Sequence, residues 1–429
     1  MVSIIQKLQR LKKVSDMQMN GKKKIELLAP AGDLERLKIA VLYGADAVYL
    51  GGKQFSLRSR ASNFTIDDIA EGVKFANAHG SHVHVTVNML PHEEDMDGLK
   101  EYLMELERIG VTAIIAASPT IMMCAKKYAP KLEVHVSTQH SSTNSSAANY
   151  WKKKGMDRVV LAREVTLEEI KETAKHTDVP LEVFIHGGMC ISYSGRCVLS
   201  NNMTGRDANR GGCAQSCRWK YRLYDKDQPI HDEHDLFSMS SKDLMAARYI
   251  PELIKAGIAS LKIEGRMKSA YYIATLIKTY RLLIDEVYEK GSISEEKMQW
   301  YVQEFSKAEN RPTAIGFYEG QPLPSAQLYG VNGAGVTQEF IAYVLDYDAD
   351  TKVAKLEVRN NFKPFIEAEV FGPTITTTKF KFEELYDKDG NAMEVAKTPM
   401  QIIYAKVPCP MEKDAMIRKV MKKDRSDIY

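Results

Sequence analysis

Residues 26–52 read ELLAPAGDLERLKIAVLYGADAVYLGG, and this stretch decides the fold class. Two short apolar runs, at residues 25–29 and 47–50, are typical of strands in a parallel sheet that is buried on both faces. Between them, residues 34–44 carry apolar side chains at helical spacing. The stretch therefore predicts a strand–helix–strand unit, the repeating element of α/β folds.

The same alternation of strand and helix continues to about residue 291. Further candidate strands lie at residues 82–88, 113–117, 132–137, 158–161, 181–186 and 260–264. Further helical stretches lie at residues 66–79, 95–110, 141–155, 166–176, 242–257 and 270–288. Eight alternations over about 265 residues predict a TIM-like (β/α)8 barrel rather than an open doubly wound sheet. No G-x-G-x-x-G fingerprint follows the first strand, which weakens the dinucleotide-binding alternative further.

The order along the chain predicts several regions. We expect a basic N-terminal tail at residues 1–24, the barrel at 25–295 with a cysteine-rich insertion at 187–235 after its seventh strand, and a linker at 296–335. From 336 to 429, short alternating strands separated by turn residues predict a small C-terminal antiparallel β-barrel domain. Such a domain binds nucleic acid or a partner, or simply covers the barrel.

The composition is that of an ordinary globular protein. Hydrophobic residues make up 44% of the 429 residues and charged residues 27%, and the net charge of +3 is too small to indicate nucleic acid by itself. No apolar run has the length of a signal peptide core or a membrane span. We therefore expect a cytoplasmic protein without a membrane partner, whose thiols are reduced.

Four of the six cysteines fall within 28 residues, at Cys190, Cys197, Cys213 and Cys217. Their spacing, C-x6-C-x15-C-x3-C, lacks the two short pairs of a zinc ribbon, whereas an iron–sulfur cluster requires only that four thiolates converge in space. An iron–sulfur cluster, a zinc ion and no metal at all remain open on this pattern. The insertion lies in a loop at the carboxyl end of a strand, where barrel enzymes build their active sites.

The cysteine-rich insertion is also basic, with aromatic side chains between the cations. Between residues 196 and 222 there are six Lys and Arg side chains and one acid. Guanidinium groups pair with phosphates and aromatic rings stack on bases, so the segment is a candidate RNA-binding mouth. The same side chains would also suit a dicarboxylate substrate, an anionic cluster or a solvated loop. The candidates for substrate or RNA contact are Arg163, Arg196, Arg206, Arg210, Arg218, Trp219 and Tyr193.

Polar residues follow several strands and should meet at the same mouth of the barrel. They include Asn88, Thr138, Gln139 and Arg163. His186, Glu264 and Arg266 are the candidates for catalytic roles. A hydrogen-bonded structural histidine, and an ion pair that braces the barrel rim, are the alternatives.

The run Glu182-x-Phe184-x-x-Gly187-x-x-Cys190, followed by Gly195-x-Cys197-x-x-Ser200, resembles the signature of the collagenase-like peptidase family U32. Gly188 stands where that signature usually has Ser or Ala. The opening stretch at 26–52 and SLKIEGRMKS at 260–269 are similar to the same family, and the β-rich region resembles its C-terminal domain.

The resemblance implies more than the label of peptidase. Branches of this family look like iron–sulfur proteins that hydroxylate ubiquinone precursors, a ribosomal RNA cytidine or the wobble uridine of tRNA without dioxygen. The long form seen here is most similar to the tRNA branch, which depends on prephenate and makes 5-hydroxyuridine. By resemblance, Cys190, Cys197, Cys213 and Cys217 hold a 4Fe–4S cluster, tRNA is the partner, and a shorter paralogue is a possible second subunit.

Two other classes of function remain as alternatives to the hydroxylase. One is a U32-type peptidase, although the H-E-x-x-H, G-x-S-x-G and Walker A motifs are all missing from the sequence. The other is a non-catalytic RNA-binding subunit of a paralogue pair.

Overall fold

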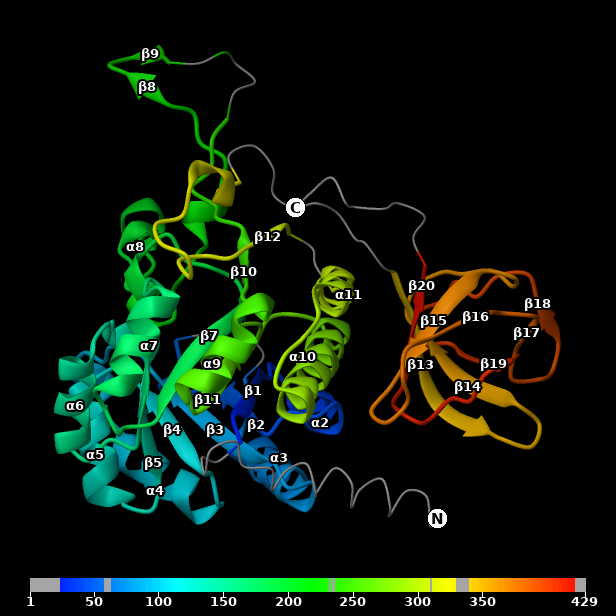
Figure 1. Cartoon of the computed structure of the whole chain (residues 1–429), viewed down its shortest axis with the longest axis horizontal. Coiled ribbons are helices and arrows are strands. Elements are labelled where there is room, and N and C mark those ends of the chain that lie inside the picture. The colour runs from blue at the N-terminus through cyan, green and yellow to red at the C-terminus, as the bar shows by residue number, and fades with distance from the viewer. Residues whose placement is uncertain are drawn as a thin grey trace.

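The computed structural model describes residues 24–57, 63–230, 232, 236–308, 311–328 and 339–420. As predicted, eight parallel strands form a closed barrel surrounded by helices (Figure 1). The barrel closes because its last strand pairs with both the first and the seventh. The strands are β1 Glu26–Pro30, β2 Ala47–Gly51, β3 His82–Val87, β4 Ala113–Ala116, β5 Glu133–Val136, β6 Arg158–Val160, β7 Leu181–Gly187 and β11 Ser260–Ile263.

Several of the helices that cover the barrel begin at residues whose side chains cap their first turn. Thr65 and Asp68 form a reciprocal capping box at the start of α3, which satisfies two backbone N–H groups that the helix leaves free. The helices are α2 Leu34–Leu42, α3 Ile66–Ala78, α4 Leu99–Arg108, α5 Pro119–Tyr128, α6 Ser145–Lys153, α7 Leu167–Lys175, α9 Ile250–Ala256 and α10 Ala270–Lys290. Among the described residues, none of the helices combines the length and apolar character needed to cross a membrane.

The helix expected at residues 242–257 is shorter than the sequence predicts. Its first residues form the strand β10, Asp243–Met245, which pairs with the end of β7, and the helix α9 starts only at Ile250. Pro251 in the first turn favours this start, because proline lacks the N–H that an interior position requires. Tertiary pairing with β7 therefore overrides the helical pattern of this segment.

The segment 296–335, for which the sequence predicts a linker, is structured in most of its described part. Residues Glu295–Ser306 form the helix α11, which buries Met298, Tyr301 and Phe305 in the barrel core. The strand β12, Thr313–Ala314, then pairs with β10. These residues belong to the barrel because their apolar side chains pack against it. The remainder of the segment, from residue 329, lies outside the described residues.

The insertion after β7 stands above the carboxyl ends of the strands. It contains the short helix α8, Leu199–Thr204, and a small hairpin, β8 Tyr224–Asp225 and β9 Gln228–Pro229, which projects away from the barrel (Figure 1). Of the N-terminal tail expected at residues 1–24, only Lys24 is described, and its ammonium pairs with the Asp285 carboxylate at 2.9 Å.

From residue 339 the chain forms a separate antiparallel sheet that curls into a half-barrel, as the sequence predicts. Its eight strands lie in the order β16–β15–β20–β13–β14–β19–β17–β18. They are β13 Glu339–Asp348, β14 Val353–Val358, β15 Glu367–Phe371, β16 Thr378–Lys381, β17 Leu385–Tyr386, β18 Ala392–Met393, β19 Ile402–Lys406 and β20 Met416–Lys419. Alternate residues of β14 are buried in a core of its own, as expected of a sheet with one covered face.

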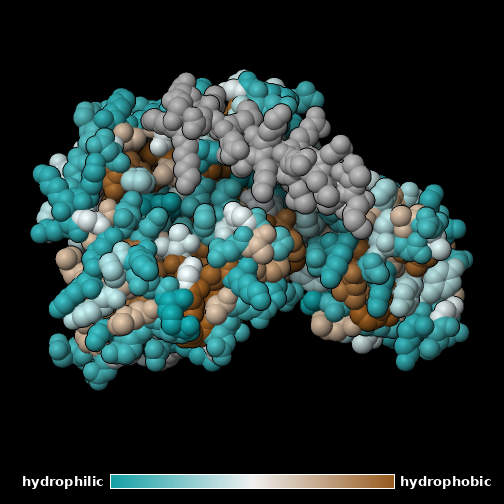
Figure 2. Space-filling view, turned by 90° about the horizontal axis from the view of Figure 1, so that it is seen from below, coloured by the Kyte–Doolittle hydropathy of each residue, from teal (hydrophilic) through white to brown (hydrophobic). Residues whose placement is uncertain are grey.

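The sheet packs against the side of the barrel formed by α2, α10 and α11 (Figure 1). Tyr271 on α10 stacks on Phe340 with 5.3 Å between ring centroids, and the Tyr43 hydroxyl donates to the Asp414 carbonyl oxygen at 2.8 Å. The space-filling view in Figure 2 shows the two parts as lobes of unequal size on a mostly hydrophilic face.

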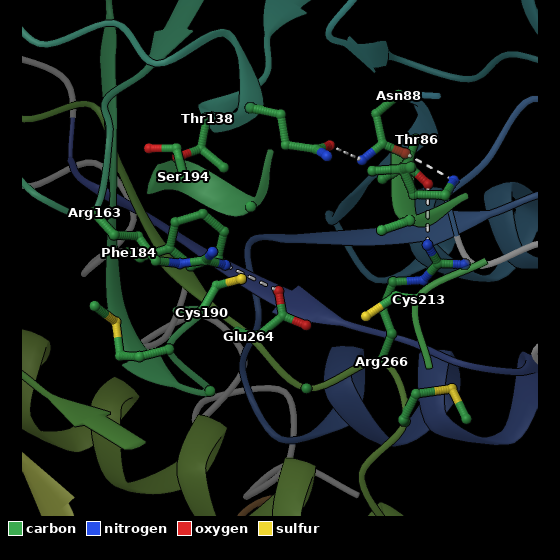
Figure 3. Close-up of a pocket in the computed structure, with 18 of the residues that line it drawn as sticks. Thr86, Asn88, Thr138, Arg163, Phe184, Cys190, Ser194, Cys213, Glu264 and Arg266 are labelled. Atoms are coloured by element: carbon green, nitrogen blue, oxygen red, sulfur yellow. Dashed lines mark hydrogen bonds and ion pairs between the residues drawn. The ribbon is translucent and has the colours of Figure 1, made fainter. Parts of the chain in front are cut away.

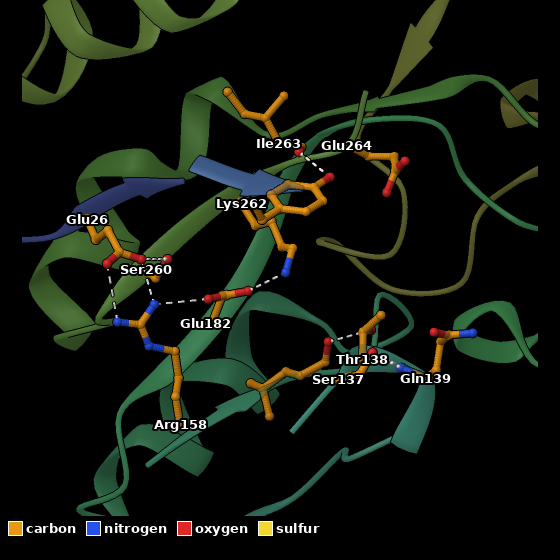
Figure 4. Close-up of polar contacts among 12 residues, drawn as sticks. Glu26, Ser137, Thr138, Gln139, Arg158, Glu182, Ser260, Lys262, Ile263 and Glu264 are labelled. Carbon is orange, nitrogen blue, oxygen red and sulfur yellow. Dashed lines mark hydrogen bonds and ion pairs between the residues drawn. The ribbon is translucent and has the colours of Figure 1, made fainter. Parts of the chain in front are cut away.

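A chain of buried charges crosses the inside of the barrel (Figure 4). Lys262 donates to Glu182 at 2.7 Å, and Arg158 bridges Glu182 at 3.1 Å and Glu26 at 2.5 Å. Burial acts to raise the pKa of Glu26, but the charges of His84 and Arg158 outweigh it and lower that pKa to about 2. Each of these buried charges is thus paired with an opposite charge on the neighbouring side chain.

We expect the protein to lose stability in acid in two stages. Burial lowers the pKa of His84 to about 3, so protonation of the unfolded chain below pH 6.5 already favours unfolding. Glu26, with its lowered pKa, contributes stability above about pH 4.5 that is lost as the pH falls toward 2. Urea unfolding at a series of pH values measures this. Glu26→Gln should flatten the dependence below pH 4.5 only, and an unchanged slope there would contradict the assignment.

Candidate functional site

A cavity of about 620 Å³ lies at the carboxyl ends of the barrel strands, beneath the insertion. Its walls come from the ends of β2, β3, β7 and β11, from the segment after β5, and from the insertion itself (Figure 3). The volume is that of a site for a small molecule or a single nucleotide base with part of its sugar.

The cavity is strongly cationic. Among the described residues, seven Arg and Lys side chains line it against two carboxylates, so it attracts anions. The cations are Arg163, Arg206, Arg218, Lys262, Arg266, Lys268 and Arg311, and the carboxylates are Asp243 and Glu264.

A glycine directs the chain from β7 into the insertion. Gly187 has φ of 105°, and a Cβ atom there would clash with the Glu264 carbonyl oxygen. Only glycine therefore lets β7 and the segment after β11 approach so closely. Further along, the Glu164 carboxylate anchors the insertion by accepting from the Ser194 N–H at 2.7 Å and the Ser194 hydroxyl at 2.6 Å.

Cys190, Cys213 and Cys217 line the cavity, and Cys197 lies close to this group. Burial raises the pKa of Cys217, and the other three thiols lie close enough for their charges to raise it as well. The Leu199 N–H donates to the Cys197 sulfur at 3.3 Å. Burial raises the pKa of Cys190, which the Ser192 N–H and the Arg163 charge partly oppose.

The four soft thiols of the insertion, three in the cavity wall and Cys197 close to them, form a donor set that suits an iron–sulfur cluster or zinc. Among the described residues, no three His, Cys, Asp or Glu side chains converge closely enough to ligate a single metal ion. Backbone N–H groups are aimed at two of the four sulfurs, those of Cys190 and Cys197. In its chemistry, this set of four thiols fits a cluster.

Arg266 is fixed within the wall of the cavity. Its guanidinium donates to the Thr86 hydroxyl at 3.2 Å (Figure 3). It also donates to the Ser56 hydroxyl at 3.2 Å and to the Asn63 side-chain oxygen at 2.9 Å. A Cβ atom on Gly51 would clash with this guanidinium, so the glycine makes room for it. Arg266 is thus held rigidly, with its charge beside the cavity.

In the cavity wall, a guanidinium nitrogen of Arg163 lies 3.3 Å from a carboxylate oxygen of Glu264, so the two residues form an ion pair. The Arg163 guanidinium also lies over the ring of Phe184, 3.8 Å from its centroid. Nearby, Asn88 donates to the Gln139 side-chain oxygen at 2.8 Å. Two amides, one guanidinium and one carboxylate are therefore presented to a ligand in this part of the cavity.

The structure places His186 away from the cavity. Its ring is buried on the outer side of β7, where Nδ1 contacts the Tyr280 hydroxyl at 3.1 Å, and burial lowers its pKa to about 3. The cause is a shift in the pairing of β7 with β11: Phe184 pairs with Lys262, and His186 with the next residue, Ile263. This bulge interrupts the alternation of faces, so His186 does not follow Glu182 and Phe184 inward.

Four other residues singled out by sequence lie around the cavity rather than in it. Arg210 is engaged by Glu94 at 2.5 Å and Asp95 at 2.8 Å, which compensates its charge. Arg196 donates to the Gln139 carbonyl oxygen. Tyr193 and Trp219 are exposed on the insertion, at 52% and 42%. Arg206 and Arg218, in contrast, line the cavity.

Sequence reasoning missed four charged residues of the cavity. Lys262 is hidden inside a strand, Asp243 lies where a helix was expected, and Arg311 lies in the segment expected to be a linker. Lys268 follows β11 within the motif SLKIEGRMKS, which was the only signal that could have found it. Their positions depend on pairing between distant segments.

Comparison with known proteins identifies similar chains. Residues 32–327 match the model of peptidase family U32, and residues 336–418 match the model of its C-terminal domain. A tRNA hydroxylation protein P1 of Bacillus subtilis is 48% identical over 94% of this chain and 97% of its own. A 23S rRNA 5-hydroxycytidine C2501 synthase of Escherichia coli is 38% identical over 62% of this chain and 40% of its own. A collagenase of Porphyromonas gingivalis is 32% identical over 84% and 89%.

Proposed function

The chain belongs to peptidase family U32, and from this premise we propose that it is a tRNA-modifying hydroxylase that converts the wobble uridine to 5-hydroxyuridine. The proposal includes an iron–sulfur cluster, prephenate as co-substrate and independence of dioxygen. The observation that carries it is the meeting of the cysteine thiols with a cationic cavity at the mouth of the barrel. The names of the two similar hydroxylating proteins support the same reaction class.

Hydroxylation replaces the C5–H bond of uracil with C5–OH, an oxidation that ordinary side chains do not perform. Cys190, Cys197, Cys213 and Cys217 would hold a 4Fe–4S cluster, which would supply the redox chemistry of the reaction. The N–H groups directed at Cys190 and Cys197 would stabilise the thiolates that such a cluster requires.

The other residues of the cavity would bind and orient the substrates. A wobble base is already unpaired in an anticodon loop, so turning it into a pocket costs little. The amides of Asn88 and Gln139 offer a donor and an acceptor for the edge of uracil. Arg266, fixed by three hydrogen bonds, would hold an anionic group without losing conformational freedom on binding.

The relative named as a collagenase favours a second candidate, a peptidase. The peptidase requires a nucleophile or an activated water in the cavity, and its activity on denatured collagen should survive loss of the cluster. The hydroxylase should lose all activity with the cluster. A non-catalytic subunit would bind tRNA but require a shorter paralogue for every turnover.

We expect cells lacking this chain to lose 5-hydroxyuridine and the wobble nucleosides derived from it. Growth without dioxygen silences any oxygen-dependent route, and mass spectrometry of digested tRNA measures the nucleosides. The wild-type gene should restore them. Unchanged nucleosides in the deletion strain would contradict the proposal and direct attention to ribosomal RNA, quinones and gelatin cleavage.

A further inference from the structure

Two guanidinium groups share one hydroxyl oxygen at the wall of the cavity. Arg218 donates to Ser240 Oγ at 3.3 Å, and Arg311 donates to the same atom at 2.6 Å. Each is anchored a second time by a backbone carbonyl, Arg218 by Met189 at 3.3 Å and Arg311 by Ser241 at 2.5 Å. Two like charges are therefore held close together, which is unfavourable unless an anion lies between them.

Among the described residues, two cations of this corner lie within 4 Å of the same carboxylate, that of Asp243. Lys268 lies 3.5 Å from Asp243, and Arg311 lies 3.7 Å from it. These ion pairs are loose beside the 2.7 Å pair of Lys262 with Glu182. Among the described residues, neither Asp243 Oδ1 nor Arg311 Nε has a hydrogen-bond partner, although both atoms are buried. The charges of this corner are thus unbalanced and incompletely paired.

The backbone that carries this corner is well anchored. Asp243 begins β10 and Ser240 lies three residues before it; the Asp243 N–H donates to the Pro312 carbonyl oxygen at 3.0 Å. Lys242 N–H donates to the Ala326 carbonyl oxygen at 2.9 Å. The cations are therefore organised in advance, which reduces the entropy lost when a ligand binds.

We propose that Arg218, Lys268 and Arg311 form an oxyanion subsite, in which Asp243 balances part of their charge when the subsite is empty and competes with the ligand for them. The ligand is a carboxylate or phosphate group. It belongs either to a free small acid or to the RNA backbone next to the target base. This inference deepens the proposed function, on which the choice of these two sources rests. All four residues line the cavity of the cysteines, so the bound group lies within the same chamber as the reaction.

Binding of two probes to the full chain, purified without dioxygen, tests the subsite. The probes are prephenate and a synthetic anticodon stem-loop RNA, each titrated calorimetrically. Arg311→Met should weaken binding of one probe about ten- to a hundredfold, because a charge-assisted hydrogen bond is lost. An effect on prephenate alone assigns the subsite to a small acid, and an effect on the RNA alone assigns it to a phosphate. Lys268→Met repeats the test should Arg311→Met fail to fold.

The Asp243→Asn variant shows whether Asp243 competes with the ligand for the cations or is needed to hold them in position. Asp243 competes with the ligand for the cations, so its neutralisation should leave binding unchanged or tighten it, whereas a brace would weaken binding as much as Arg311→Met does. Arg248→Met, at an exposed ion pair with Glu295 on the outer surface, is the matched control and should bind both probes normally. Unchanged affinities in Arg311→Met, weakening in Asp243→Asn, or a wild type that binds neither probe overturns the subsite. Normal binding without hydroxyuridine formation contradicts the proposed function alone.

Discussion

Replacing Cys190 with serine should abolish formation of 5-hydroxyuridine while the barrel stays folded. A serine hydroxyl remains protonated at neutral pH and is a poor ligand for iron, so the proposed cluster loses one of its four protein ligands. The side chain is only partly buried, at the mouth of the cavity and outside the core, so its exchange for serine removes few contacts. The expected loss is complete, not partial, because the redox step has no substitute among the side chains.

Complementation of the deletion strain, with hydroxylated nucleosides quantified by mass spectrometry, measures this result. Absorbance of the purified variant near 400 nm and its circular dichroism separate loss of the cluster from loss of the fold. Cys124→Ser is the matched control, because Cys124 lies on α5, outside the insertion and the cavity. It should retain both colour and activity. A colourless Cys190→Ser protein with full activity would exclude the cluster from the reaction.

Arg418→Met should lower the free energy of unfolding by about 3–5 kcal/mol, the usual effect of breaking a buried ion pair on one side. Arg418 on β20 is 1% exposed and lies between the barrel and the C-terminal sheet. It donates to Glu304 of α11 at 2.8 Å and to Glu369 of β15 at 2.9 Å. Without it, Lys307 is the one cation among the described residues that still contacts both buried carboxylates, at 2.5 Å and 2.9 Å.

Urea unfolding, and limited proteolysis that detects release of the sheet from the barrel, measure this effect. Glu369→Gln added to Arg418→Met should recover part of the stability, because one uncompensated charge is removed. Arg108→Met, at an exposed ion pair with Glu105, serves as the control for a surface arginine and should leave the unfolding midpoint almost unchanged. A small effect of Arg418→Met, equal to that of the control, would show that the two carboxylates do not depend on it.

The barrel was predictable because its signal is local. Each strand is a short apolar run between helical stretches, and eight such repeats leave few alternative topologies. The C-terminal sheet was predictable for a similar reason, since polar and apolar residues alternate in its strands. The strand β10 was not, because its three residues become a strand only through pairing with the end of β7.

Part of the candidate site followed from the same reasoning. The carboxyl ends of parallel strands meet at one end of a barrel, so Asn88, Arg163, Glu264 and Arg266 were expected near one another, and the structure places them in one cavity. His186 is different, because the shifted pairing of β7 with β11 turns it outward. A one-residue bulge leaves no mark in the hydrophobic pattern, so sequence alone does not reveal which way such a residue faces.

The sequence by itself determined the barrel, the antiparallel sheet and the gathering of four thiols in one insertion, because each depends on residues that are neighbours along the chain. Only the tertiary structure decided which charges share the cavity. Arg218, Asp243, Lys268 and Arg311 come from segments separated by up to about a hundred residues. They meet because β10 pairs with the end of β7 and β12 pairs with β10. The electrostatics of the site therefore depend on long-range pairing, which local patterns do not encode.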